Sequence, residues 1–126
     1  MKSGVNRRVV LAEDDADISF LIEEHLLREG YEVFTTADGA EAINLIASYR
    51  PRVALLDIMM PDVDGYEICK EVQSNDWSKH IKIIFLSAKS KEADIQKGIE
   101  LGAVSYITKP FSSKQLLAEV QQHLSK

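Results

Sequence analysis

Apolar runs and amphipathic segments alternate along the chain. Short apolar runs predict strands at residues 8–12, 31–36, 52–57, 81–86 and 104–108. Between these runs, apolar residues recur every three or four positions, which is the spacing of one buried face of a helix. These segments predict helices that contain residues 18–28, 42–47, 68–72, 91–101 and 115–126. The sequence therefore predicts five strands that alternate with five helices.

The order of these elements indicates the fold class. Strands that alternate with helices through short loops are typical of parallel strands joined by right-handed crossovers. The runs at 8–12, 52–57 and 81–86 are almost wholly apolar, as expected for strands that are covered on both faces. We therefore expect an α/β fold with three layers and a doubly wound, five-stranded parallel sheet. With 126 residues and no linker-like stretch, we expect one domain over residues 1–126, with an ordered core from about 7 to 124.

Composition and charge exclude several classes of protein. Apolar residues make up 45% of the chain, which is typical of an ordered globular domain. No apolar run approaches the roughly 20 residues of a membrane span, and residues 1–8 lack the apolar core of a signal peptide, so we expect a cytoplasmic location. A net charge of −5 argues against a basic, nucleic-acid-binding face. Cys69 is the one cysteine, so a disulfide framework is excluded, and its position predicts a small core residue.

The strongest chemical signal is Asp57. It ends the apolar run at 52–57 and is followed by a loop that contains Pro61, Asp62, Asp64 and Gly65. An ionised carboxylate is costly to bury unless it is paired or coordinated. We therefore interpret Asp57 as a chemical group that the predicted sheet presents at its edge.

Polar residues also follow three other predicted strands. Ligands of doubly wound sheets bind beyond the carboxyl ends of the strands, near the point where the strand order reverses. We expect the polar residues that follow the strands to meet there: Glu13, Asp14 and Asp15 after the first, Asp57 after the third, Ser87 after the fourth, and Thr108 and Lys109 after the fifth.

This set of residue types indicates phosphoryl transfer. Crowded carboxylates repel one another, so a cation among them is expected. Hard oxygen ligands without His or Cys suit Mg²⁺, with Mn²⁺ as the alternative. A metal, a lysine and a hydroxyl beside a carboxylate can neutralise a phosphoryl group while the carboxylate attacks it. The predicted product is an aspartyl phosphate on Asp57.

Structural roles compete for some of these residues. Asp15 or Asp17 can instead cap the first helix, and Asp62 and Asp64 are interpreted as turn residues rather than ligands. Trp77 is interpreted as a packing lid or a surface residue. Lysines near the fourth helix are interpreted as a solvated face.

Together, the polar residues resemble the receiver domain of bacterial two-component response regulators, over residues 8–124. The matching residues are Glu13-Asp14, Asp57 with Met59-Met60-Pro61, Asp64-Gly65, Ser87-Ala88, and Tyr106 with Lys109-Pro110-Phe111. The resemblance implies a flavodoxin-like fold with the strand order 2-1-3-4-5.

The resemblance also implies a phosphoacceptor site. Asp57 is expected to accept a phosphoryl group from a sensor histidine kinase or a histidine phosphotransfer protein. Glu13, Asp14, Asp57 and the backbone carbonyl of Met59 are expected to hold Mg²⁺. The chain is then a signalling switch rather than an enzyme, with at most self-catalysed phosphorylation and dephosphorylation of Asp57.

A second group of residues is expected to transmit the signal. The resemblance implies that Ser87 bonds the phosphoryl group, that Lys109 pairs with Asp57, and that the bond before Pro110 is cis. Tyr106 is then the switch aromatic, which turns inward as Ser87 moves. The face made by the fourth helix, fifth strand and fifth helix is expected to change and to control an effector protein or output domain.

Some positions depart from the common pattern of these regulators. Ser87 stands where threonine is commoner, and Val104-Ser105 stands where dimerising regulators often carry an acidic pair. The predicted fifth helix has no arginine. We therefore expect either a monomer or a phosphorylation-linked dimer. Met59 and Lys89 are the positions expected to tune dephosphorylation.

Three alternative functions would use a similar set of residues or the same fold. A phosphatase of the haloacid-dehalogenase type places its nucleophile after the first strand and a second aspartate two positions later, where this chain has Asp57 after the third strand and Met59. A flavin-binding module needs a phosphate-cradling loop after the first strand, where Glu13, Asp14 and Asp15 would repel phosphate. A receiver that has lost phosphorylation would lack one of the required residues, all of which are present.

Overall fold

The predicted order of strands and helices is confirmed. The computed structural model describes residues 6–124, so residues 1–5 and 125–126, which include the last residues of the predicted fifth helix, lie outside the described part. The strands are β1 (Arg8–Ala12), β2 (Glu32–Thr36), β3 (Val53–Asp57), β4 (Lys82–Ser87) and β5 (Ser105–Thr108). The helices are α1 (Ala16–Arg28), α2 (Gly39–Tyr49), α3 (Gly65–Gln73), α4 (Glu92–Glu100) and α5 (Ser113–Leu124).

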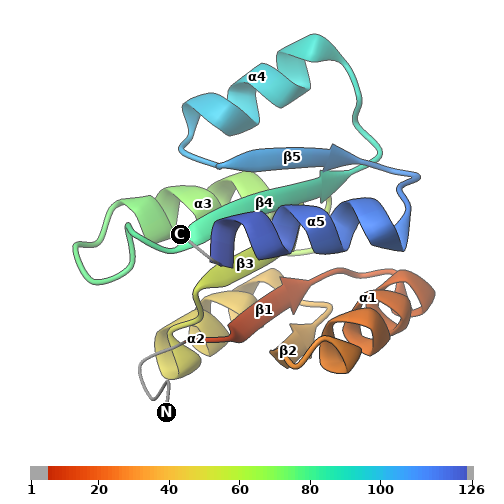
Figure 1. The fold of residues 1–126 in the computed structure, drawn as a ribbon. Coiled ribbons are helices and arrows are strands. Elements are labelled where there is room, and N and C mark those ends of the chain that lie inside the picture. The colour runs from red at the N-terminus through yellow and green to blue at the C-terminus, as the bar shows by residue number, and fades with distance from the viewer. Residues whose placement is uncertain (1–5, 125–126) are drawn as a thin grey trace.

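The strands form one parallel sheet in the order β2-β1-β3-β4-β5, as expected. The arrowheads of β1, β4 and β5 point the same way in Figure 1, toward the edge where the polar residues follow the strands. Ala12 pairs with Leu56, so the residues that follow them, Glu13 and Asp57, lie side by side. Asp57 in turn pairs with Leu86, the residue before Ser87.

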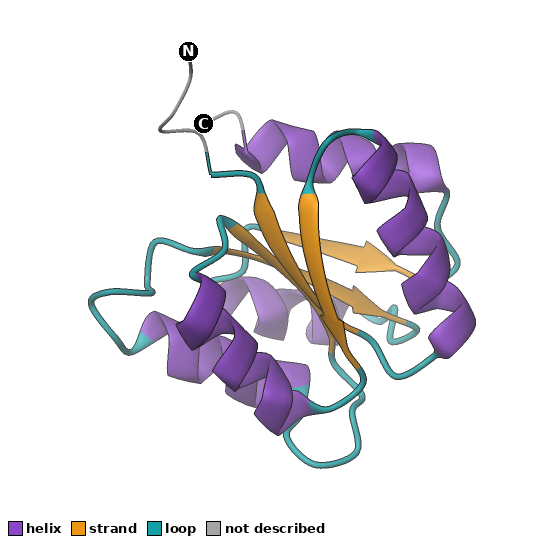
Figure 2. Cartoon of the chain, turned by 90° about the horizontal axis from the view of Figure 1, so that it is seen from below, coloured by secondary structure: helices purple, strands orange, loops and turns teal. Residues whose placement is uncertain are grey.

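Helices cover both faces of the sheet (Figure 2). Successive strand residues point to opposite faces, so Val9 and Leu11 join one apolar cluster and Val10 and Ala12 join the other. The first cluster also contains residues of α1 and α5, and the second contains residues of α2 and α3. This three-layer packing buries β3 completely, which explains why its sequence is a continuous apolar run.

Aspartates begin three of the helices. Asp15 Oδ1 accepts hydrogen bonds from the backbone N–H groups of Asp17 and Ile18, at 3.0 and 3.1 Å, so Asp15 rather than Asp17 caps α1. Asp38 and Asp64 cap α2 and α3 in the same way. Such caps are each worth about 1 kcal/mol. They also turn the carboxylates of Asp15 and Asp64 toward helix ends, away from a ligand role.

Helix α4 lies directly on aromatic rings. Gly98 is its buried residue, and a Cβ at this position would come within 2.9 Å of the Phe85 ring and 3.1 Å of the Tyr106 ring. The absence of a side chain at Gly98 therefore lets the helix backbone approach the sheet closely.

Two further sequence interpretations are settled by burial. Cys69 is fully buried, and burial raises the pKa of its thiol to about 11. It is therefore a core residue. Trp77 is partly exposed, and the guanidinium of Arg50 lies 4.7 Å from the centroid of its ring, so it is a surface residue with one packed face.

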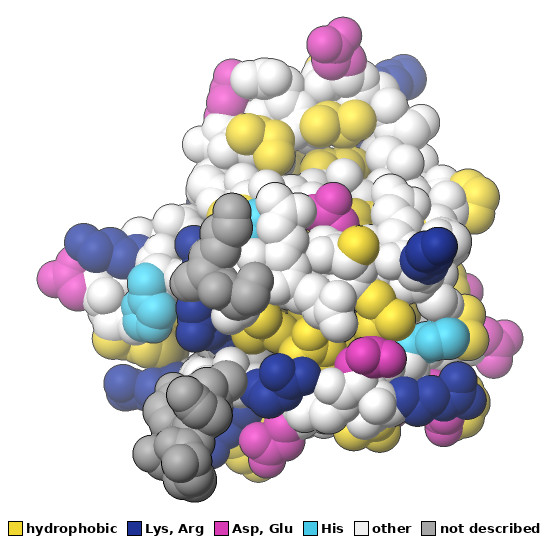
Figure 3. Space-filling view, in the orientation of Figure 1, with side chains coloured by type: hydrophobic (Ala, Val, Ile, Leu, Met, Phe, Trp, Pro, Cys, Tyr) yellow, Lys and Arg dark blue, Asp and Glu magenta, His cyan; other side chains and the backbone are white. Residues whose placement is uncertain are grey.

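Basic and acidic side chains are interspersed over the face seen in Figure 3. Among the helices of residues 6–124, none combines the length and the apolar character that a membrane crossing requires.

Candidate functional site

The carboxyl ends of β1, β3 and β4 bring the polar residues together. Asp57 and Glu13 are buried, with 4% and 1% of their surfaces exposed, whereas Asp14 is exposed. One carboxylate oxygen from each of the three lies within 4.8 Å of the others. The sequence-predicted carboxylates therefore form one cluster, which is open to solvent on the side of Asp14.

Lys109 joins this cluster from the end of β5. Its Nζ lies 3.1 Å from Asp57 Oδ2 and 2.9 Å from Glu13 Oε1, and it donates a hydrogen bond to Glu13 Oε2 at 3.1 Å. Burial by itself would lower the pKa of Lys109, but its bonds to Glu13 and Asp57 outweigh burial and raise that pKa. Lys109 therefore stays protonated, and one positive charge faces two buried carboxylates.

Glu13 is the most perturbed member of the cluster. Burial raises its pKa to about 7, with a smaller contribution from the negative charge of Asp57. The hydrogen bonds from Lys109 and from the Asp15 N–H, the latter at 3.0 Å, lower the pKa but do not offset burial. A single lysine is therefore too little positive charge for this group of carboxylates.

The donor set fits a hard divalent cation. Glu13 Oε1 is buried and, among the described residues, receives no hydrogen bond of good geometry, although it lies in the ion pair with Lys109. A cation placed among Glu13, Asp14 and Asp57 would satisfy this oxygen and lower the repulsion between the carboxylates. Carboxylate oxygens are also the ligands that Mg²⁺ prefers.

The loop after β3 turns tightly around Asp57. The N–H of Met59 donates to Asp57 Oδ1 at 3.0 Å, and the N–H of Gly65 donates to the carbonyl of Ile58 at 3.0 Å. A Cβ at Gly65 would lie 2.6 Å from the Asp57 carbonyl oxygen. Gly65 is therefore required for the start of α3 to lie against the end of β3, and this turn leaves Met59 exposed beside the cluster.

Ser87 links the cluster to the loop between β4 and α4. The residue is fully buried, and its Oγ accepts a hydrogen bond from the N–H of Lys89 at 3.0 Å. Its carbonyl accepts from the N–H of Lys109 at 2.8 Å, and the peptide bond between Lys109 and Pro110 is cis. Thr108 pairs with Ser87 across β4 and β5. Ser87 thus contacts both Lys109, which follows β5, and the loop that leads to α4.

Tyr106 contacts the same loop. Its hydroxyl donates to the carbonyl of Lys89 at 2.8 Å, and its ring meets that of Phe85 edge to face, with the centroids 6.1 Å apart. Lys89 is therefore held on both sides, through its N–H by Ser87 and through its carbonyl by Tyr106.

Tyr66 is a residue of this region that the sequence reasoning missed. Its hydroxyl donates to the carbonyl of Asp94 in α4 at 3.2 Å, and its ring meets Phe85 at 5.4 Å between centroids. The ammonium of Lys97 lies 4.4 Å from the centroid of the Tyr66 ring, so this lysine is not part of a simple solvated face. The available signal was an aromatic residue directly after the glycine of the site loop.

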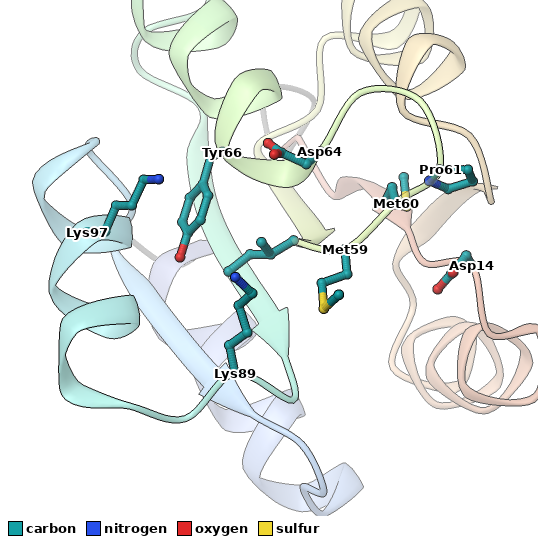
Figure 4. Close-up of a pocket in the computed structure, with 9 residues that line it drawn as sticks. Asp14, Met59, Met60, Pro61, Asp64, Tyr66, Lys89 and Lys97 are labelled. Carbon is teal, nitrogen blue, oxygen red and sulfur yellow. The ribbon is translucent and has the colours of Figure 1, made fainter.

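A cavity of about 570 Å³ opens beside the carboxylate cluster. Figure 4 shows Asp14 on one side of it and Tyr66 with Lys97 on the other, while Met59 lies between them. Lys89 extends into the same region from the loop after β4 (Figure 4). The cavity gives a second molecule access to the exposed side of the site.

Comparisons with known proteins agree with this arrangement. The family model described as the response regulator receiver domain matches residues 9–121. Chemotaxis protein CheY4 of Vibrio cholerae is 31% identical, with a TM-score of 0.86 over 93% of this chain and 98% of that chain. The receiver domain of response regulator 1452 of Francisella is 30% identical, with a TM-score of 0.89 over 95% and 98% of the two chains.

A third similar structure contains a metal. It is the receiver domain of sensor histidine kinase PA1611 from Pseudomonas aeruginosa, which has a magnesium ion coordinated in its active site cleft. Its sequence is 27% identical, and its TM-score is 0.87 over 96% of this chain and 99% of that chain.

Proposed function

Because this chain belongs to the response regulator receiver domain family, we propose that Asp57 accepts a phosphoryl group in an Mg²⁺-dependent step and that this switches a distant surface. The observation that carries the proposal is the environment of Asp57. This buried carboxylate lies beside Glu13 and Asp14 and within hydrogen-bond distance of Lys109. That combination suits a nucleophile that faces a polyanionic group better than it suits a structural residue.

The metal would be held by Glu13, Asp14, Asp57 and the carbonyl of Met59. When bound, Mg²⁺ neutralises negative charge on the phosphoryl oxygens. Lys109 supplies a second positive charge, 3.1 Å from Asp57 Oδ2. With its charge balanced, a carboxylate oxygen of Asp57 forms the new bond to phosphorus. The bond from phosphorus to a histidine nitrogen of the donor breaks, and its electron pair stays on that nitrogen.

The switch follows from the contacts of Lys89. A phosphoryl group adds roughly −1.5 to −2 units of charge and three acceptor oxygens. Ser87 Oγ now accepts from the N–H of Lys89, and its hydroxyl would turn to donate to the phosphoryl group. Lys89 would then shift, and Tyr106, which is bonded to the Lys89 carbonyl, would follow. The surface of α4, β5 and α5 changes as a result.

The partners follow from this mechanism. A sensor histidine kinase or a histidine phosphotransfer protein supplies the phosphoryl group, and an effector protein or domain reads the surface of α4, β5 and α5. We propose that residues 1–126 are one receiver domain that works in the cytoplasm and contacts neither nucleic acid nor membrane directly. It would work as a monomer or as a phosphorylation-linked dimer, without enzyme activity on a separate substrate.

The phosphatase alternative lacks support at position 59. A haloacid-dehalogenase-type mechanism needs a carboxylic acid two positions after the nucleophile, and Met59 has no proton to donate. Both oxygens of the Asp57 carboxylate accept hydrogen bonds: Oδ1 accepts from the N–H of Met59, and Oδ2 accepts from Lys109. These contacts suit an ionised carboxylate that receives a phosphoryl group.

Intact-mass measurement tests the phosphoacceptor. The protein is incubated with acetyl phosphate and Mg²⁺, and the expected result is a gain of about 80 Da, the mass of one phosphoryl group. Asp57→Asn should show no gain, and chelation of Mg²⁺ should suppress the gain in the wild-type protein. An adduct that persists in Asp57→Asn, or no adduct on the wild-type protein, would overturn the proposal.

A further inference from the structure

We propose that Asp62 is a positioning residue, which ties the loop between β3 and α3 to the start of α2 and so holds the Met59 carbonyl in place for the metal. This inference rests on the proposed function, because it assigns Asp62 a part in Mg²⁺ binding at that site. Asp62 lies outside the carboxylate cluster, and its effect would pass through the loop.

The tie consists of hydrogen bonds to a helix N-terminus. Asp62 Oδ1 accepts from the N–H of Gly39 at 2.9 Å, and Oδ2 accepts from the N–H of Ala40 at 3.2 Å. These are the first two residues of α2, whose N–H groups have no partner within the helix. The helix dipole also favours a negative charge at this end.

The charge state of Asp62 agrees with these contacts. The pKa of its carboxyl is lowered to about 2, first by a bond from the N–H of Val63, then by the bonds from Gly39 and Ala40, and least by a contact with the Asp38 side chain, which together outweigh burial. Asp62 is therefore ionised throughout the neutral range, and the tie persists under conditions in which the site works.

Backbone packing places the loop against the same helix end. A Cβ at Gly39 would clash with the backbone carbonyl of Val63, the residue after Asp62. The loop and the first turn of α2 are therefore in direct contact, and the bonds from Asp62 fix one against the other. Glycine at position 39 is what permits this approach.

The rest of the loop is held by hydrogen bonds at its two ends and by the buried side chain of Met60, which packs in the apolar core. Met59 is bonded through its N–H to Asp57, and Gly65 is bonded to Ile58. Between these ends, Met59 and Pro61 are exposed. Figure 4 shows the loop running from Met59 through Pro61 before it curves back to Asp64. Among residues 6–124, Asp62 thus supplies the side-chain hydrogen bonds that attach this loop to α2, beside the apolar packing of Met60 and Val63.

A held loop helps metal binding because the ligand does not have to be ordered when the ion arrives. A free loop would lose conformational entropy at that moment, and this loss weakens binding. Residues that orient metal ligands without touching the metal typically change affinity by about 10–100-fold when they are removed. We expect the lower end of this range for Asp62, because it acts on one backbone ligand.

Asp38 offers a matched control. It also caps α2, by accepting from the N–H of Glu41 at 3.1 Å, but it lies in the segment before the helix and not in the loop between β3 and α3. Its contact with the Asp62 carboxylate is the weakest of those that Asp62 makes, so Asp38→Ala leaves the bonds of Asp62 to Gly39 and Ala40 in place. Asp38→Ala and Asp62→Ala should therefore weaken the same helix end, whereas Asp62→Ala also releases the loop.

The experiment measures Mg²⁺ binding by calorimetry in the wild-type protein, Asp62→Ala, Asp62→Asn and Asp38→Ala, with thermal unfolding of each. We expect a Kd about tenfold higher for Asp62→Ala, an intermediate Kd for Asp62→Asn, which keeps one acceptor oxygen, and a wild-type Kd for Asp38→Ala. At saturating Mg²⁺, Asp62→Ala should regain the wild-type rate of phosphorylation by acetyl phosphate. A lost rate at every Mg²⁺ concentration would contradict a role through the metal.

The outcomes separate this inference from the proposed function. If the wild-type protein binds no Mg²⁺ or takes no phosphoryl group, both fail. If the wild-type protein does both and Asp62→Ala binds Mg²⁺ equally well, the positioning role alone is overturned. An equal loss of affinity in Asp38→Ala would also overturn it, because the effect would then come from the helix end. If Asp62→Ala does not fold, Asp62→Asn, which retains one acceptor, supplies the same comparison.

Discussion

The ammonium of Lys109 lies 2.9 Å from Glu13 Oε1, a buried carboxylate oxygen that receives no well-formed hydrogen bond among residues 6–124. The pair joins the ends of β1 and β5, which are not neighbours in the sheet. Lys109 also bonds Asp57, so one cation serves two buried carboxylates. This shortage of positive charge leads to the first prediction.

Mg²⁺ binding should weaken as the pH falls from 8 to 6. The pKa of Glu13 is raised to about 7 in the metal-free protein, chiefly by burial. Below this pH, a proton occupies the carboxylate that the metal needs, and metal binding must displace it. We expect the apparent Kd to rise by up to about tenfold per pH unit below 7 and to change little above it. Calorimetry in buffers with different heats of ionisation measures both the Kd and the proton released.

The control for this prediction is Glu13→Gln. It removes the titrating group, so Mg²⁺ binding should become weaker but nearly independent of pH between 6 and 8. A wild-type Kd that stays constant over this range, with no proton released, would show that Glu13 is already ionised in the metal-free protein.

Gly65→Ala should impair phosphorylation, whereas Gly98→Ala should not. A Cβ at Gly65 meets the Asp57 carbonyl oxygen at 2.6 Å, and a Cβ at Gly98 meets the Phe85 ring at 2.9 Å. Overpacking of this kind costs about 1–3 kcal/mol at either position. The Gly65 variant should also slow phosphorylation by acetyl phosphate at least about tenfold, since small misplacements of reacting groups are costly.

Chemical denaturation and the rate of mass gain test this pair of variants. The geometry predicts that both variants lose a similar amount of stability and that only Gly65→Ala gains mass slowly. Equal rates in both variants would mean that the contact between Gly65 and Asp57 does not control the reacting carboxylate.

Ser87→Ala should separate phosphorylation from the switch. The substitution removes the Oγ that bonds the N–H of Lys89, at a cost of about 1 kcal/mol. Asp57 and Lys109 keep their contacts, so the gain of about 80 Da should still occur. The change that phosphorylation causes in amide exchange of the loop after β4 should be lost.

Hydrogen exchange with and without acetyl phosphate measures this effect. Ser87→Thr retains the hydroxyl and should behave like the wild-type protein. If Ser87→Ala shows the full exchange response, then the hydroxyl does not link the phosphoryl group to the loop.

Cys69 should not react with thiol reagents in the folded protein. Burial raises the pKa of its thiol to about 11, and the thiolate is the reactive form. At pH 8 the thiolate fraction is then on the order of 10⁻³, and the side chain is fully buried. An absorbance assay with a disulfide reagent should show one reactive thiol in guanidinium chloride and almost none without it. Rapid reaction of the folded protein would contradict the burial of α3 against the sheet.

The sequence by itself determined the elements of the fold and the main residues of the site. The apolar run at β3 could be interpreted because a strand covered on both faces leaves no room for polar positions. Asp57 was recognisable because a carboxylate that ends such a run has no packing role. Ser87 and Lys109 were expected beside it, since parallel strands deliver the residues that follow them to one edge.

Tertiary structure decided how those residues are paired. The register that sets Glu13 beside Asp57, the raised pKa of Glu13 and the two contacts of Lys89 all depend on atoms from segments far apart in the chain. The contact of Tyr66, at the start of α3, with Asp94 of α4 and the contact of Asp62 with α2 were likewise not predictable. Periodicity and composition report what each segment prefers locally, whereas these contacts depend on how the helices and loops pack around the finished sheet.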